Sequence, residues 1–132
     1  MPWQAYLHYG DRRLLERHYA GMKHYLGWMY SLAQTNGTLF CKLPNGKDTY
    51  WLNLGDWCAP DKKLPPRDLV HTFYLWYCTD LLGRIADALG QEGDACTYRA
   101  LAATSAAAFH AAYYDRAKGS YGPVGGDVFA LR

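Results

Sequence analysis

Helices of two kinds follow one another along this chain of 132 residues, and this alternation limits the folds that the chain can adopt. In the segment 12–33, apolar residues recur at intervals of four and three, so they share one side of a helix while the charges lie elsewhere. In the segment 67–89, no charge occurs between Asp68 and Asp80, and apolar side chains cover every side. A helix that is apolar all round is buried all round. The pattern therefore predicts an inner and an outer layer of helices.

Glycine and aspartate residues indicate where these helices begin and end. We expect Gly10 and Gly90 to end helices, because glycine readily takes the left-handed conformation that follows a last turn. We expect Asp11 and Asp94 to cap the helices that follow, with a side-chain oxygen accepting a free backbone N–H. The predicted helices cover residues 2–9, 12–33, 67–89 and 95–114, and a fifth starts at Asp127. The sequence thus predicts an all-α fold built of helical hairpins.

Charge and composition exclude several classes of protein. The net charge of +2 gives no basic field, so we expect no nucleic-acid partner. The longest uncharged helical stretch, residues 69–79, is about half of the ~20 residues that a membrane span needs, so no membrane partner is expected. No signal peptide is predicted, and the cytoplasm is the default location. The four cysteines and five histidines lack metal-ligand spacing, so neither a metal nor another cofactor is predicted.

The long segment 38–66, which shows no sustained periodicity, carries the clearest functional signal. Within it lies Gly55-Asp56-Trp57. An indole ring can cover the apolar face of a sugar while a neighbouring carboxylate accepts protons from its hydroxyl groups. The alternative is a turn in which Trp57 is a buried anchor. Candidates for the rim of the same pocket are Trp51, Asp61 and His71, of which His71 fits a buried core histidine equally well.

The acidic residues do not form a recognisable catalytic pair. Hydrolysis of a glycoside requires two carboxyl groups, one as the acid and one as the base or nucleophile. The chain has two glutamates: Glu16 lies among arginines on the charged side of a predicted helix, and Glu92 lies in a predicted turn. We therefore assign no catalytic residue. The remaining acidic residues near the long segment are Asp48, Asp56, Asp61 and Asp68.

An ordered series of short motifs resembles the six-hairpin domain of bacterial α-L-rhamnosidases over nearly the whole chain. The series comprises Pro2-Trp3-Gln4-Ala5-Tyr6, Tyr9-Gly10-Asp11, Gly55-Asp56-Trp57, Thr72-Phe73-Tyr74, Leu89-Gly90 and Tyr98-Arg99-Ala100-Leu101. The resemblance implies a single partial domain over residues 1–132, forming part of an (α/α)6 toroid. In that arrangement the segments 2–9, 67–89 and 127 onward are inner helices, and 12–33 and 95–114 are outer ones.

The resemblance also implies an activity, the release of terminal L-rhamnose by an inverting, metal-independent glycoside hydrolase. Its acid and base glutamates would belong to segments before Pro2 and beyond Arg132, so we expect the chain alone to be inactive. Trp57 would stack on the sugar and Asp56 would bind its hydroxyl groups. The implied partners are a rhamnose-containing glycoside and either the rest of the catalytic domain or a second copy of the chain.

Two other functions remain open from the sequence. One is a different (α/α)6 glycosidase, of the glucoamylase or trehalase kind. The other is a helical-hairpin interaction module without enzymatic activity.

Overall fold

The computed structural model describes residues 2–39, 65–122 and 125–131, so most of the long segment 38–66 lies outside the described residues. Within the described residues the structure is helical, and the only extended pairings are two isolated bridges, between Ala33 and Leu39 and between Asp115 and Ser120. This confirms the predicted all-α fold. The helices are α1 (Pro2–Tyr9), α2 (Arg13–Ser31), α3 (Arg67–Ala88), α4 (Glu92–Tyr113) and α5 (Gly126–Ala130).

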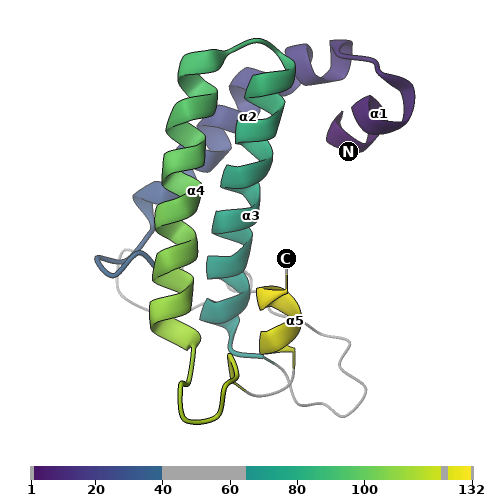
Figure 1. The fold of residues 1–132 in the computed structure, drawn as a ribbon. Coiled ribbons are helices and arrows are strands. Elements are labelled where there is room, and N and C mark those ends of the chain that lie inside the picture. The colour runs from purple at the N-terminus through teal and green to yellow at the C-terminus, as the bar shows by residue number, and fades with distance from the viewer. Residues whose placement is uncertain (1, 40–64, 123–124, 132) are drawn as a thin grey trace.

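The helices α3 and α4 form a long antiparallel hairpin, and α2 and α5 lie against it (Figure 1). Helix α2 packs against α3, and α1 packs against α2 near the end of the hairpin where α3 turns into α4. The short α5 lies beside the opposite end, next to the N-terminal part of α3. The start of α3, the end of α4 and α5 therefore meet at one end of the molecule.

Burial differs between α2 and α3 as their sequence patterns predict, whereas α1, expected to be an inner helix, has no buried residue. Ten of the 22 residues of α3 are buried, against three of the 19 residues of α2. Burial of α3 is nevertheless incomplete, since the described helices leave Tyr74 48 % exposed. The main core joins α2 to α3 and consists of Leu15, Leu26, Met29, Leu39, Leu75, Leu82 and Ile85.

The two predicted caps have different outcomes. Asp11 serves the start of α2 as expected, because its Oδ1 atom accepts the backbone N–H of Arg13 at 3.0 Å. The prediction for Asp94 was wrong: α4 already begins at Glu92, and Asp94 lies inside its first turn. Its carboxylate instead accepts hydrogen bonds from Tyr19 and Lys23 of α2, each at 2.7 Å.

This carboxylate ties α4 to α2 and shifts the pKa values of the groups involved. The hydrogen bonds from Lys23 and Tyr19 lower the pKa of Asp94. Burial, followed by the Asp94 hydrogen bond, raises the pKa of Tyr19 well above its usual value near 10. Tyr19 therefore keeps its proton, and its hydrogen bond to Asp94, at pH values where a free tyrosine is ionised.

A second polar contact joins three helices inside the core. The Tyr30 hydroxyl of α2 lies 3.0 Å from Thr79 Oγ1 of α3 and 2.9 Å from Ser105 Oγ of α4. Ser105 is 4 % exposed and Thr79 is fully buried, so water cannot replace Tyr30 as their partner. This contact fixes how α2 sits across the α3/α4 hairpin.

We predict that Tyr30→Phe lowers the free energy of unfolding by about 1–3 kcal/mol, because it removes a hydrogen-bond partner from the buried Ser105. Urea unfolding followed by circular dichroism measures the change. Tyr25→Phe is the matched control, since Tyr25 lies on the same helix and is 55 % exposed. An equal loss in both variants would contradict the role given to Tyr30.

We further predict that the stabilising effect of the Tyr19 hydroxyl shrinks as the pH rises above about 10. The unfolded chain then loses the Tyr19 proton while the folded chain keeps it, so alkaline pH favours unfolding of the wild-type chain. Tyr19→Phe lacks this group, and the gap in unfolding free energy between the two proteins should narrow from pH 8 to pH 11. A gap that stays constant over this range would disprove the raised pKa.

Candidate functional site

The residues predicted to bind sugar are only partly within the described structure. Trp51, Asp56, Trp57 and Asp61 lie outside the described residues. The described residues that flank them are Leu39 and Pro65, and both are buried. Both lie at the N-terminal end of α3. The backbone N–H of Leu39 donates to Thr72 in the second turn of this helix, and Pro65 lies two residues before its start. Both described ends of this segment thus lie at one end of the hairpin, which is the candidate site among the described residues.

His71 is the one predicted site residue that the structure describes. It lies in the second turn of α3, is half-buried, and has a ring nitrogen, Nε2, that is shielded from solvent. It directly precedes Thr72, which contacts Leu39. His71 thus lies at the same end of the hairpin as the two flanking residues.

A network of hydrogen bonds that the sequence did not reveal surrounds Thr72, which is fully buried. Its hydroxyl donates to the backbone carbonyl of Asp68 at 2.6 Å and accepts the backbone N–H of Leu39 at 3.0 Å. The Tyr113 hydroxyl from the end of α4 lies 3.2 Å from Thr72 Oγ1 and donates to the Asp68 carboxylate at 3.1 Å. Burial, supported by the Asp68 charge, raises the pKa of Tyr113 to about 12, so this donor stays protonated at neutral pH.

Aromatic side chains line a cavity of about 210 Å³ next to this network, between α3, α4 and α5. Phe73 of α3 contacts Phe129 of α5 with ring centroids 4.9 Å apart. At the polar edge, His110 Nδ1 lies 2.7 Å from the Tyr121 hydroxyl. The cavity offers flat apolar faces and one polar edge; its lining residues are Phe73, Trp76, Ala106, Phe109, His110, Tyr121, Phe129 and Ala130.

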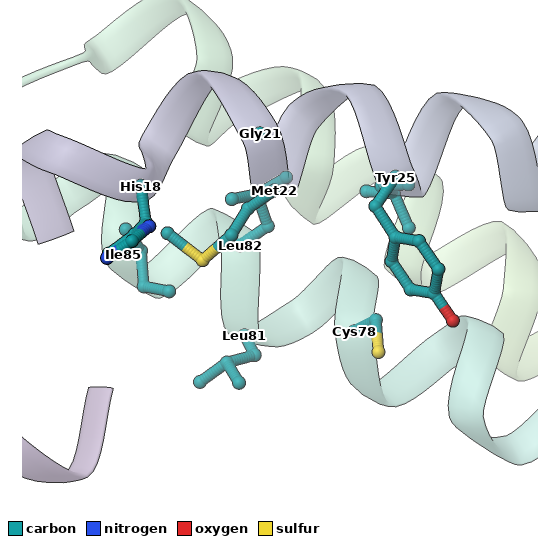
Figure 2. Close-up of a pocket in the computed structure, with 9 residues that line it drawn as sticks. His18, Gly21, Met22, Tyr25, Cys78, Leu81, Leu82 and Ile85 are labelled. Atoms are coloured by element: carbon teal, nitrogen blue, oxygen red, sulfur yellow. The ribbon is translucent and has the colours of Figure 1, made fainter. Parts of the chain in front are cut away.

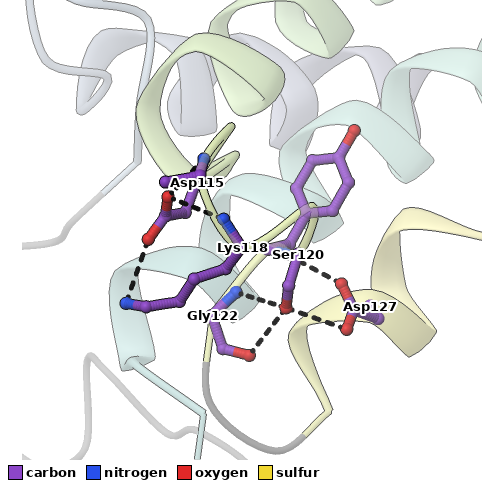
Figure 3. A network of polar contacts seen from close by, with 7 residues as sticks. Asp115, Lys118, Ser120, Gly122 and Asp127 are labelled. Atoms are coloured by element: carbon purple, nitrogen blue, oxygen red, sulfur yellow. Dashed lines mark hydrogen bonds and ion pairs between the residues drawn. The ribbon is translucent and has the colours of Figure 1, made fainter.

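The turn between α4 and α5 is held by two carboxylates (Figure 3). Asp127, in the first turn of α5, accepts the backbone N–H of Tyr121 at 2.7 Å and the Ser120 hydroxyl at 3.0 Å. Asp115 accepts the backbone N–H of Lys118 and pairs with its ammonium group at 3.0 Å, which lowers the pKa of Asp115. Both carboxylates are thus occupied in shaping this glycine-rich turn.

A larger cavity, of about 320 Å³, lies between α2 and α3 (Figure 2). Its described lining contains no carboxylate, and it includes Met22 and Tyr25 from α2 and Cys78 from α3. Burial raises the pKa of the Cys78 thiol, so it stays protonated and is a poor nucleophile at neutral pH. The described lining, which includes His18, therefore lacks the two carboxyl groups that hydrolysis of a glycoside requires.

A third hollow, of about 150 Å³, lies between α1 and α3 and combines indole rings with a carboxylate. Trp3 and Trp76 line it together with Asp80. Arg84 pairs with Asp80 at 2.9 Å, so this carboxylate already has a cationic partner.

The two glutamates lie outside the candidate site, because they belong to the first turns of α2 and α4 and not to the start of α3. Glu16 is in the first turn of α2, exposed, and 3.9 Å from Arg12. Glu92 is the exposed first residue of α4. It lies at the end of the hairpin opposite to the start of α3.

Among the described residues no group of three or more His, Cys, Asp or Glu side chains could hold a metal ion. None of the described helices has the length and apolar character needed to cross a membrane.

Comparison with known proteins places the chain in a family. Residues 1–127 match the domain family described as the bacterial alpha-L-rhamnosidase 6 hairpin glycosidase domain. The fold is similar to that of the alpha-L-rhamnosidase from Dictyoglumus thermophilum, with a TM-score of 0.71 and 32 % sequence identity over 87 % of this chain. The chain spans 12 % of the length of that rhamnosidase. No curated protein matches the sequence. By its match over almost its entire length, the chain belongs to the family of bacterial α-L-rhamnosidase six-hairpin glycosidase domains.

Proposed function

We propose that this chain supplies part of the sugar pocket of an inverting glycoside hydrolase that releases terminal L-rhamnose. The observation that carries the proposal is the family match over residues 1–127. The similar rhamnosidase supports it, since a third of the aligned residues are identical. Because the chain spans 12 % of that protein, the proposed activity is that of a larger catalytic domain.

In the proposed pocket, Trp57 stacks on the apolar face of the sugar and Asp56 accepts protons from its hydroxyl groups. Trp51, Asp61 and His71 line the rim. The position of His71 supports this arrangement, because it lies at the end of α3 where the flanking residues Leu39 and Pro65 are also found.

The proposed domain is a single partial six-hairpin unit over residues 1–132, with α1, α3 and α5 as inner helices and α2 and α4 as outer ones. The heavy burial of α3 and the light burial of α2 support this assignment. Apolar side chains exposed on α1 and at α5 favour contact with further helices of the domain or with a second copy. Their exposed fractions are 57 % for Leu7, 84 % for Tyr9, 70 % for Val128 and 86 % for Leu131.

The proposal assigns the acid and the base to other parts of the larger protein. Inverting hydrolysis needs two carboxyl groups ~6.5–9.5 Å apart across the bond that is cleaved. Glu16 and Glu92 are exposed residues of α2 and α4, and neither lies at the start of α3. The residues of this chain would therefore bind the sugar and leave the proton transfers to groups outside it.

We predict that the purified chain binds L-rhamnose and that Trp57→Ala weakens this binding about tenfold or more, a loss of roughly 1.4 kcal/mol of binding free energy. Titration followed by tryptophan fluorescence and by calorimetry measures the affinity. Trp28→Ala is the matched control, because Trp28 lies on the outer helix α2 and is 45 % exposed.

The choice of sugar separates the proposal from its alternatives. Tighter binding of glucose or trehalose than of rhamnose would favour another (α/α)6 glycosidase. A folded chain that binds none of these sugars would overturn the proposed pocket and favour an interaction module.

We also predict that the chain alone does not hydrolyse p-nitrophenyl α-L-rhamnoside, because sugar binding without an acid and a base adds little to the rate. Release of nitrophenol measures the activity, with Asp56→Asn assayed beside the wild-type chain. Turnover that disappears in Asp56→Asn would instead place the catalytic carboxylate in this chain.

A further inference from the structure

We propose that the aromatic cavity between α3, α4 and α5 is a binding site for a small phenol, that is, a single aromatic ring that carries a hydroxyl group. The cavity has a volume of about 210 Å³. None of its described lining residues belongs to the proposed sugar pocket. The site therefore goes beyond the proposed function and does not depend on it.

Aromatic rings from three helices and the turn before α5 form the walls of the cavity. Phe73 and Trp76 are three residues apart on α3, so they share one face of that helix, and their ring centroids are 5.7 Å apart. The ring of Phe129 in α5 lies 4.9 Å from that of Phe73. The ring of Phe109 in α4 stacks on that of Tyr121 at 5.6 Å. Such flat apolar faces pack well against another aromatic ring.

Two small side chains leave room inside these walls. Ala106 of α4 and Ala130 of α5 lie among the large aromatic residues of the lining. An apolar cavity of roughly 150 Å³ in another protein is large enough to bind benzene, so this cavity can hold one ring with a substituent. Ala106 and His110 are both exposed, so the cavity reaches the surface on the α4 side and a ligand can enter there.

The polar edge of the cavity favours a ligand with a hydroxyl group. His110 Nδ1 lies 2.7 Å from the Tyr121 hydroxyl. A tyrosine hydroxyl can donate one proton and accept others, and its contact with His110 uses only one of these positions. Whichever of the two groups is the donor, the Tyr121 oxygen can still accept a proton from a ligand. A phenol presents that proton on the rim of a flat apolar ring.

The place of Tyr121 in the wall does not depend on its own hydroxyl group. Asp127 accepts the backbone N–H of Tyr121 at 2.7 Å. The Tyr121 ring also packs against Phe109 and against Tyr114, the latter at 5.0 Å between centroids. Tyr121→Phe should therefore keep the ring in the wall and remove only the polar group, which tests the hydroxyl separately from the cavity.

A larger side chain at Ala106 tests the cavity itself. Ala106→Leu adds apolar volume at the lining, and leucine is a good helix former, so α4 should tolerate it. Ala107→Leu is the matched control, because Ala107 is the exposed neighbour on the same helix and is not among the described lining residues.

The experiment titrates phenol, and toluene as a probe of nearly the same shape without a hydroxyl group, into the wild-type chain and the three variants. Calorimetry gives the affinities. The NMR signal of the Trp76 indole N–H reports binding in the cavity, and that of Trp28 serves as the reference, since Trp28 lies on α2 and is 45 % exposed. Sedimentation velocity gives the oligomeric state.

We expect the wild-type chain to bind both probes with a change at Trp76 and none at Trp28. Ala106→Leu should weaken both affinities about tenfold or more, while Ala107→Leu should leave them unchanged. In Tyr121→Phe the ratio of phenol affinity to toluene affinity should fall by about threefold to tenfold, as the loss of one hydrogen bond predicts.

Several outcomes would overturn the proposal. They are a folded wild-type chain that binds neither probe, equal affinities in Ala106→Leu and Ala107→Leu, an unchanged affinity ratio in Tyr121→Phe, and a change at Trp28 as large as that at Trp76. Self-association of the wild-type chain that Ala106→Leu abolishes would also overturn it, because a second copy would then fill the cavity. If Ala106→Leu does not fold, the affinity ratio in Tyr121→Phe and the Trp76 signal decide.

This proposal and the proposed function fail separately. A chain that binds phenol in the cavity but no rhamnose would support the phenol site and contradict the sugar pocket. A chain that binds rhamnose but neither aromatic probe would overturn the phenol site alone.

Discussion

Along α3, buried residues meet three neighbours at once, α2, α4 and α5. Such a helix has no continuous polar side to present to water, so its stability depends on being covered. The main core is made where α2 covers it, through Leu15, Leu26 and Met29. A second, aromatic cluster forms where α4 and α5 cover it, around Phe73 and Phe109. Helices α2, α4 and α5 thus each cover part of this one helix.

Apolar contacts alone define poorly how a buried helix is rotated and shifted, whereas buried hydrogen bonds have strict geometry. Thr72 and Thr79 provide such fixed points on α3. They are seven residues apart, nearly two full turns, and so lie on about the same side of the helix. Each donates its proton to a backbone carbonyl of α3, and its oxygen lies close to a tyrosine hydroxyl, that of Tyr113 of α4 or Tyr30 of α2. Thr72 makes one further contact, since its hydroxyl oxygen also accepts the backbone N–H of Leu39.

At the candidate site, the sequence predicted some features and missed others. The pairing of Asp56 with Trp57 suggested a sugar pocket, which stays a prediction, because both residues lie outside the described structure. The motif could not reveal the network around Thr72, because Leu39 and Thr72 are 33 residues apart and neither stands out in sequence. The spacing of Asp68 and Thr72 by four residues was the one available signal, and it is common in helices.

The sequence by itself determined the type and approximate limits of the helices, since periodicity and glycine positions act within a few residues of the chain. It was right about the heavily buried α3, the one-sided α2 and the cap from Asp11. Tertiary structure decided the use of Asp94, which pairs with Tyr19 at a separation of 75 residues instead of capping its own helix. A carboxylate at the start of a helix can cap its own helix or bind side chains of another helix. Asp94 does the second, because Tyr19 and Lys23 of α2 lie within hydrogen-bond distance of it in the folded chain.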